Sequence, residues 1–161
     1  MKKSNLSEHS AAFPKAHKYK IGIVVSEWNP TVTDALKQGA IESLLEHGVT
    51  ESNITVHNVP GSFELPLGAA MLLDADDDLD GVICLGCVIQ GETRHFEFIS
   101  QAVAQGAMRV GLDYEVPVVF GVLTCDTMEQ ALDRSGGKHG NKGVEGAYTV
   151  LKMIELQRKL K

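Results

Sequence analysis

Gly81-Val-Ile-Cys-Leu-Gly86 is a short, uninterrupted apolar run, and it gives the first indication of fold class in this chain. Three more runs rich in Val and Ile resemble it, at residues 21–25 (IGIVV), 54–59 (ITVHNV) and 116–123 (VPVVFGVL). A strand inside a parallel sheet is buried on both faces, so its sequence is apolar almost throughout and does not alternate. The four runs therefore predict four parallel β-strands.

Segments with helical spacing lie between these runs and after the last of them. Apolar residues recur three or four positions apart over residues 32–45, 96–110 and 144–154. Asn29 is expected to cap the first of these helices, with Pro30 in its first turn. Strands that alternate with helices predict an α/β fold, here a three-layer αβα sandwich in which a four-stranded parallel sheet has helices on both faces.

The chain of 161 residues is long enough for one compact domain. Residues 1–18 show no periodicity and are expected to form a flexible N-terminal arm, followed by a single domain over residues 19–161. The net charge of −6 excludes a global basic field that would hold nucleic acid or an anionic membrane. No apolar run approaches the roughly 20 residues of a membrane span, and no secretory signal is evident. A cytoplasmic protein with reduced thiols is expected.

Two patterns that suggest special chemistry have simpler explanations. Cys84 and Cys87 have the spacing of a redox pair, but Cys84 lies inside a predicted strand, where positions three apart point to opposite faces. The acidic run at residues 74–80 lacks the Gly and Glu that a calcium loop has at its sixth and twelfth positions. We interpret the cysteines as structural or pocket-lining and the acidic run as a solvated loop, and we expect no metal and no cofactor.

Ligands of open parallel sheets bind beyond the carboxyl ends of the strands. The segments to examine are therefore residues 26–30, 60–66, 87–96 and 124–127. In the third, the amides of Glu92 and Thr93 are expected at the start of a helix, where free amides and the helix dipole favour an anion. His95 lies within one turn of that place and can exchange protons near neutral pH. An ordinary capped helix with an incidental histidine would explain the same residues.

The remaining candidates also have two interpretations each. Glu64 either stabilises the start of a helix or accepts hydrogen bonds from the hydroxyls of a polyol. Trp28, the only tryptophan, is either a core residue or a platform for a planar heterocycle. The basic, glycine-rich segment at residues 134–143 is either a flexible loop or a second source of positive charge for a phosphate.

Six motifs, in order along the chain, resemble those of the lumazine synthases and cover most of it from about residue 20 to 155. They are SEWN (26–29), VPGSFELP (59–66), LGCVIQGETRHF (85–96), PVVFGVLT (117–124), EQALDR (129–134) and NKG (141–143). The resemblance implies a flavodoxin-like fold. It also implies the condensation of 5-amino-6-(D-ribitylamino)uracil with 3,4-dihydroxy-2-butanone 4-phosphate. That reaction yields 6,7-dimethyl-8-ribityllumazine, phosphate and water, and is the penultimate step of riboflavin biosynthesis.

The resemblance also implies a role for each matching residue. His95 matches the histidine that transfers protons. The residues implied for the pyrimidine ring and ribityl chain are Trp28, Ser62, Phe63, Glu64, Cys87, Val88, Ile89 and Phe120. Those implied for the phosphate are Glu92, Thr93 and Arg134, with Lys142 as a further candidate. Phe120 and Arg134 match residues that family members lend to a neighbouring subunit.

Members of the family form pentamers, and many assemble these into an icosahedral shell. The compact loop at residues 134–143 resembles the shell-forming pattern, so a homo-oligomer is expected, with riboflavin synthase as a further partner. The chain departs from the common family pattern at four positions. Glu27 and Trp28 replace the usual Arg-Phe pair, Cys87 replaces a threonine, and Gln90 replaces an arginine.

Three other functions deserve comparison. A protein of the same fold that binds the product or a flavin, without making it efficiently, is consistent with the changes at Trp28 and Gln90. A shell or storage protein with a vestigial pocket would have no need to retain Glu64, Thr93, His95 and Arg134 together. A response-regulator-like domain needs a carboxylate cluster beside the first and third strands, which Glu27 opposite Cys87 does not supply.

Overall fold

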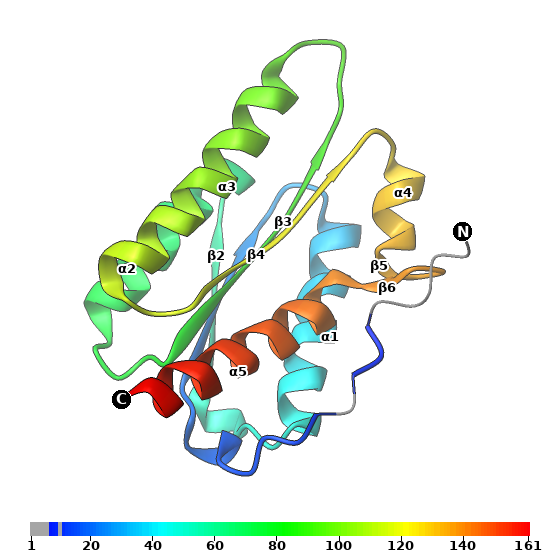
Figure 1. Ribbon diagram of the computed structural model, residues 1–161. Coiled ribbons are helices and arrows are strands. Elements are labelled where there is room, and N and C mark those ends of the chain that lie inside the picture. Colours follow the sequence, from blue (N-terminus) through cyan, green and yellow to red (C-terminus); the bar gives the residue numbers. More distant parts are fainter. Residues whose placement is uncertain (1–6, 10) are drawn as a thin grey trace.

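The computed structural model describes residues 7–9 and 11–161 and has one main sheet (Figure 1). Its strands are all parallel and lie in the order β2-β1-β3-β4. Their bounds are β1 Ile21–Ser26, β2 Ile54–Val59, β3 Gly81–Ile89 and β4 Val118–Cys125. The predicted four-stranded parallel sheet is confirmed.

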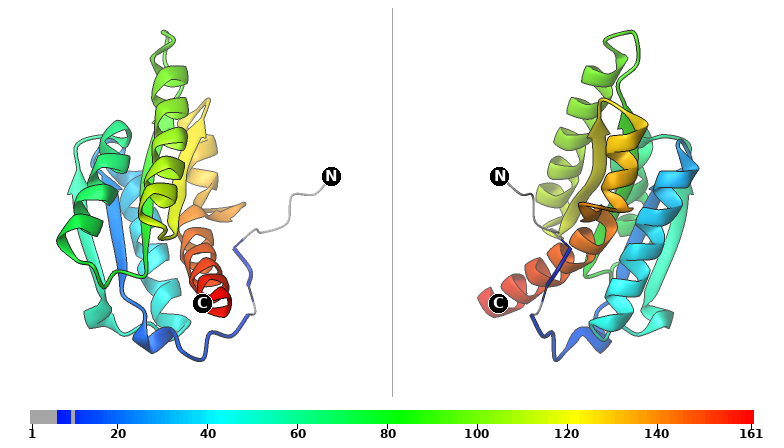
Figure 2. Two further views of the ribbon diagram at one scale, coloured as in Figure 1. Left: turned by 60° about the vertical axis from the view of Figure 1, so that its left-hand side comes forward. Right: turned by 90° about the vertical axis from the view of Figure 1, so that its right-hand side faces the viewer.

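Helices cover both faces of this sheet, as the two views of Figure 2 show. The α-helices are α1 Pro30–Glu46, α2 Leu65–Ala75, α3 His95–Tyr114, α4 Met128–Asp133 and α5 Lys142–Leu160. Short 3₁₀ helices occupy Ala16–Lys18, Glu51–Asn53 and Ser62–Glu64, and β5 Ser135–Gly137 pairs with β6 Gly140–Asn141 in an antiparallel hairpin. The predicted three-layer αβα sandwich, flavodoxin-like, is confirmed.

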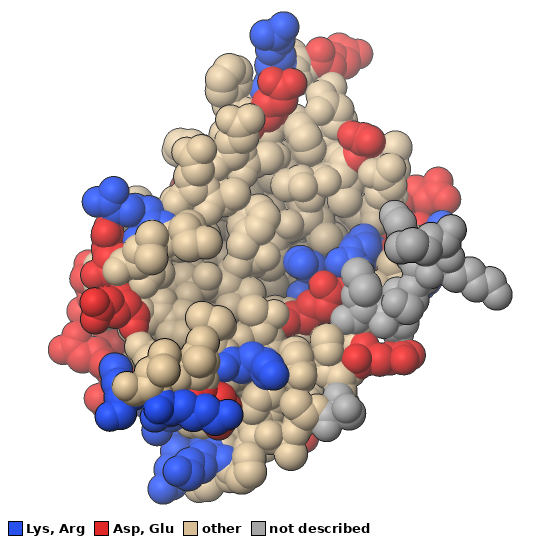
Figure 3. Space-filling model, in the orientation of Figure 1, with Lys and Arg blue, Asp and Glu red and all other residues tan. Residues whose placement is uncertain are grey.

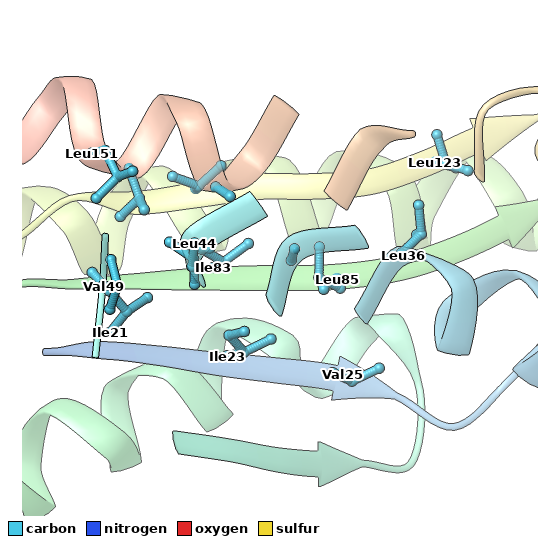
Figure 4. Packing of buried hydrophobic residues seen from close by; sticks show 14 of the residues in the cluster. Ile21, Ile23, Val25, Leu36, Leu44, Val49, Ile83, Leu85, Leu123 and Leu151 are labelled. Atoms are coloured by element: carbon cyan, nitrogen blue, oxygen red, sulfur yellow. The ribbon is translucent and has the colours of Figure 1, made fainter. Parts of the chain in front are cut away.

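The two central strands owe their apolar sequences to burial on both faces. Every residue of β1 is buried, and so are the first seven of β3. On one face, Ile23, Ile83 and Leu85 pack with residues of α1 and α5 (Figure 4). On the other, Val24 and Cys84 pack with residues of α2 and α3. Burial of this kind contributes roughly 1.5–3 kcal/mol for each large aliphatic side chain.

Strand β2, whose sequence ITVHNV includes three polar residues, is less buried than the other three strands. The four residues between Ile54 and Val59 are exposed. The cause is the strand order, because β2 pairs only with β1 and forms one edge of the sheet. An edge strand keeps an unpaired row of backbone groups on its outer side.

Part of the segment expected to be a loose arm packs against the domain. Phe13 and Ala16 are buried in the same cluster as β1, and the ring of His9 stacks on Tyr148 of α5 with centroids 3.9 Å apart. Residues 1–6 and 10 lie outside the described residues. The boundary of the flexible arm at residue 18 therefore stays a prediction.

Asn141 joins the hairpin to two helices. Its side-chain oxygen accepts hydrogen bonds from the backbone N–H groups of Gly143 (2.8 Å) and Val144 (3.4 Å), which caps α5. Its amide nitrogen donates to the carbonyl of Ala35 in α1 (2.9 Å). The two helices approach closely here, since a Cβ atom added at Gly143 would lie 1.9 Å from the carbonyl oxygen of Leu36.

The substitution Gly143→Ala should therefore lower the free energy of unfolding by about 2 kcal/mol, because the backbone of α1 must move to admit the methyl group. Urea denaturation at a fixed protein concentration would measure this. The matched control is Gly91→Ala, where an added Cβ meets no atom of the described residues within 4 Å. We expect the control to stay within about 0.5 kcal/mol of the parent chain, and equal effects of the two substitutions would contradict the packing argument.

Candidate active site

A cavity of about 690 Å³ opens at the carboxyl edge of the sheet. It lies where the segments after β1 and β2, the end of β3 and the first turns of α3 come together. The predicted residues that line it are Trp28, Ser62, Phe63, Glu64, Cys87, Val88, Ile89 and His95. Asn29, Gly61 and Ile99 line it as well. A single chain thus assembles most of the ring-binding set and the candidate proton-transfer residue in one place.

Aromatic faces flank the mouth of this cavity. Trp28 is 71% exposed and Phe63 is 57% exposed, so Trp28 is not a core residue. A Cβ atom at Gly61 would lie 3.2 Å from Cδ1 of Trp28, which shows that the indole packs against the Gly61 backbone. The same glycine donates its backbone N–H to Oε2 of Glu64 (3.0 Å). Gly61 therefore orients both side chains.

Asn29 does not act as the predicted cap. It occupies the residue before α1 with φ 59° and ψ 57°, and its side chain makes no capping hydrogen bond. The amide nitrogen donates instead to the carbonyl of Cys87 (3.1 Å), which ties the β1–α1 turn to the end of β3. Asparagine tolerates this left-handed conformation better than most residues. Pro30 lies at the start of the helix, as predicted.

The loop between β3 and α3 carries the predicted phosphate amides. Helix α3 begins at His95, whose backbone N–H donates to Oγ1 of Thr93 (3.3 Å), while Gln90 Nε2 donates to the carbonyl of Gly91 (3.0 Å). Residues 90–95 are all exposed, and in Figure 2 the loop forms a tip beyond the sheet. Glu92 and Thr93 do not line the cavity that contains His95.

The other predicted residues line different cavities of the same chain. Phe120 belongs to a mainly apolar groove of about 600 Å³ between α3, β4 and α5. Arg134 lies in a polar cavity of about 480 Å³ beyond the end of β4, and Lys142 borders both. One copy of the chain therefore does not bring Arg134, Lys142 or Phe120 to the cavity of His95.

Arg134 and Lys142 share an acidic partner that the sequence interpretation missed. Arg134 NH2 lies 3.1 Å from Oε1 of Glu145, and Lys142 Nζ lies 3.3 Å from Oε2. The first guanidinium nitrogen, NH1, donates to the backbone carbonyl of His139 (2.9 Å). The only sequence signal for this group was the i, i+3 spacing of Lys142 and Glu145 on one helix.

The cysteines lie in the two cores. Cys84 is buried between the sheet and α2, whereas Cys87 is buried on the opposite face, as the spacing predicted. Cys125 lies on the same face as Cys87. Burial raises the pKa of the Cys84 and Cys87 thiols to about 12 and also raises the pKa of Cys125. Neutral, buried thiols are poor nucleophiles, which supports the structural interpretation of the Cys84–Cys87 pair.

A family model described as 6,7-dimethyl-8-ribityllumazine synthase matches residues 18–158. The chain belongs to this family. A 6,7-dimethyl-8-ribityllumazine synthase of Cytophaga hutchinsonii is 56% identical over 150 residues, which cover 93% of this chain and 94% of that protein. One of Porphyromonas gingivalis is 50% identical over 155 residues, with 96% of each chain covered. One of Christiangramia forsetii is 45% identical over 159 residues, covering 98% of this chain and 95% of that protein.

Family membership confirms the resemblance that the six motifs indicated. The chain is a lumazine synthase enzyme, and its reaction is that of lumazine synthase in riboflavin biosynthesis. The response-regulator-like alternative is excluded. The cavity at the carboxyl edge is the candidate for the active site of this enzyme, because residues of the first three family motifs, at 26–29, 59–66 and 85–96, converge there.

The burial of the cysteines leads to a prediction about thiol reactivity. At pH 8 the native protein should react with Ellman's reagent at least about 100-fold more slowly than the denatured protein, because its thiols stay buried and neutral. The denatured chain should titrate all three cysteines. Rapid labelling of a native thiol would contradict the burial.

The same pKa shifts give a pH dependence. Folded Cys84 and Cys87 ionise only near pH 12, whereas a cysteine ordinarily ionises near pH 9. As the pH rises, the unfolded chain therefore loses these thiol protons before the folded chain does. The contribution of the two thiols to the free energy of unfolding is complete below pH 9 and should be lost as the pH rises toward 12.

Proposed function

We propose that the cavity lined by Trp28, Glu64 and His95 is where this enzyme carries out the family's condensation. The substrates are 5-amino-6-(D-ribitylamino)uracil and 3,4-dihydroxy-2-butanone 4-phosphate. The products are 6,7-dimethyl-8-ribityllumazine, phosphate and water. The observation that carries the proposal is the convergence of exposed aromatic faces, a fixed carboxylate and a histidine in one cavity.

The pyrimidine ring stacks on Trp28, and Phe63 covers the same opening of the cavity. The Gly61 amide holds the carboxylate of Glu64 in place, and this carboxylate accepts hydrogen bonds from the ribityl hydroxyls. Ser62 contributes a buried hydroxyl that has no hydrogen-bond partner among the described residues. The backbone groups of Cys87, Val88 and Ile89 contact the polar edge of the ring. Because the contact is made by the backbone, a cysteine at position 87 can replace the threonine that is common in the family.

The phosphate of the second substrate binds at the start of α3. This helix has 20 residues, so its N-terminus carries a full helix dipole, and the amides of Glu92 and Thr93 precede it. Arg134 and Lys142 of a second copy add positive charge. Such a site neutralises the phosphate as it departs.

His95 transfers protons between the reacting groups. The amine of the uracil attacks the ketone, and loss of water from the adduct gives an imine. Elimination of phosphate, ring closure and a further dehydration follow. Each step moves a proton or releases an anion, so a histidine beside an anion site can serve all of them.

The separation of the cavities supports a shared site. Phe120, Arg134 and Lys142 line cavities other than that of His95 within one chain. A second copy that presents these residues to the His95 cavity would complete the site. Exposed apolar side chains are available for such contacts on α2, α3 and α5: Leu67, Met71, Phe98, Met108, Leu112, Met153, Leu156 and Leu160.

The assembly is a pentamer, and pentamers join into an icosahedral shell. The short hairpin of β5 and β6, which has no insertion, supports this architecture. We place the enzyme in the cytoplasm, with riboflavin synthase as its partner in the next step. None of the helices among the described residues is long and apolar enough to cross a bilayer.

The substitution His95→Ala should lower kcat by roughly 10²–10⁴-fold, the usual share of a general acid–base residue, with little change in KM. Arg134→Ala should instead raise KM for the butanone phosphate. The measurement is the rate of lumazine formation, followed by absorbance and fluorescence with each substrate varied in turn. Full activity of the histidine variant would refute its role, and background-level activity of the well-folded parent chain would favour a flavin-binding or shell protein.

Mixing the two variants tests whether the site is shared. When His95→Ala and Arg134→Ala chains are co-expressed, up to about a quarter of the pockets receive an intact histidine from one chain and an intact arginine from another. The mixed oligomer should then show a component that combines the parent KM for the butanone phosphate with about a quarter of the parent kcat, a combination that neither variant has. If the co-expressed preparation lacks this component, both residues act from one chain.

A further inference from the structure

Glu145 is a partly buried carboxylate in the first turn of α5, with a side chain that is 15% exposed. Two cationic side chains contact this carboxylate. Arg134 NH2 lies 3.1 Å from Oε1 and 3.2 Å from Oε2, and Lys142 Nζ lies 3.3 Å from Oε2. In Figure 3, basic and acidic side chains adjoin where α5 begins, beside the hairpin of β5 and β6.

This geometry places two like charges side by side. Because both cations contact the same carboxylate, Arg134 and Lys142 would repel each other if it were absent. The second contact of Arg134, from NH1 to the carbonyl of His139, fixes the other end of the guanidinium group. Glu145 and His139 together hold the plane of that group. An arginine has five N–H donors, so several remain for an anion.

We propose that Glu145 is a positioning residue of the enzyme. It holds Arg134 and Lys142 together so that both receive the phosphate group of the butanone phosphate. The inference rests on the proposed phosphate role of Arg134. Glu145 itself does not touch the substrate in this account, since an acidic group beside a phosphate would repel it.

The sign of the effect separates this role from a simple charge effect. If Glu145 acted only as a negative charge, its removal would make the cavity more positive and the phosphate would bind more tightly. If it positions the two cations, its removal lets them separate and the phosphate binds more weakly. The two accounts predict opposite changes.

The test is steady-state kinetics of Glu145→Ala in the intact oligomer, with inorganic phosphate as a competitive inhibitor. We expect KM for the butanone phosphate and Ki for phosphate to rise about tenfold, the effect of losing one charge-assisted contact. KM for the ribitylaminouracil and kcat at saturation should change less than about twofold. Glu145→Asp should recover part of the loss, and Glu145→Gln less, because a neutral amide presents only one acceptor atom to two cations.

Asp113→Asn is the matched control, because Asp113 pairs with Arg109 on the exposed surface of α3, outside the cavities described above. Its kinetic constants should equal those of the parent chain. Tighter phosphate binding by Glu145→Ala, unchanged phosphate constants, or an equal loss for both substrates would each overturn the inference. An Arg134→Ala variant with normal phosphate constants would refute the proposed phosphate site itself, whereas a defective one beside a normal Glu145→Ala would refute only the role of Glu145.

Discussion

The parallel pairing of β3 with β1 on one side and β4 on the other is the constraint on which the candidate site depends. Residues 21–25 of β1 pair with residues 81–85, and residues 82–89 of β3 pair with residues 118–125. All four strands run in one direction, so the segments that follow them begin at the same edge. The Asn29 bond to Cys87 then fixes the turn after β1 against the end of β3. The sheet thus brings together two walls of the cavity, at Asn29 and Cys87, that are about 60 residues apart in sequence.

The local sequence was sufficient to predict those parts of the fold that depend on burial. Strands β1 and β3 are apolar because both faces are covered, and the position of the site follows from the direction of the strands. The place of β2 at the edge could not be predicted in the same way, because no local pattern encodes strand order, although the polar residues Thr55, His57 and Asn58 fit an exposed strand. The Asn29 side chain is a second case. Its amide could cap a helix or reach a neighbouring strand, and only the distance to Cys87 decides between them. Glu145 was missed because its contact with Arg134 crosses a hairpin and has no periodicity.

The proposed site residues are distributed over three cavities of different character. The cavity of His95 has aromatic faces and a carboxylate, whereas several cations surround the cavity of Arg134, together with the carboxylate of Asp133. Phe120 lies in the groove between α3 and α5, with Lys142 at the border. In the proposed function these cavities meet only across a contact between copies. The assembly would then be a requirement of the chemistry, in addition to any contribution that it makes to stability.

Asn141 connects the hairpin of β5 and β6, which lies between Arg134 and Lys142, to two helices of the core. Surface loops usually open by small local fluctuations, independently of the core. Here the same side chain caps α5 and bonds to α1, so opening the hairpin at this residue also breaks the start of a core helix. The backbone amides of Gly143 and Val144, which donate to this side chain, are thereby tied to the contact between α1 and α5. Arg134 and Lys142 therefore flank a segment that is anchored to the core through Asn141.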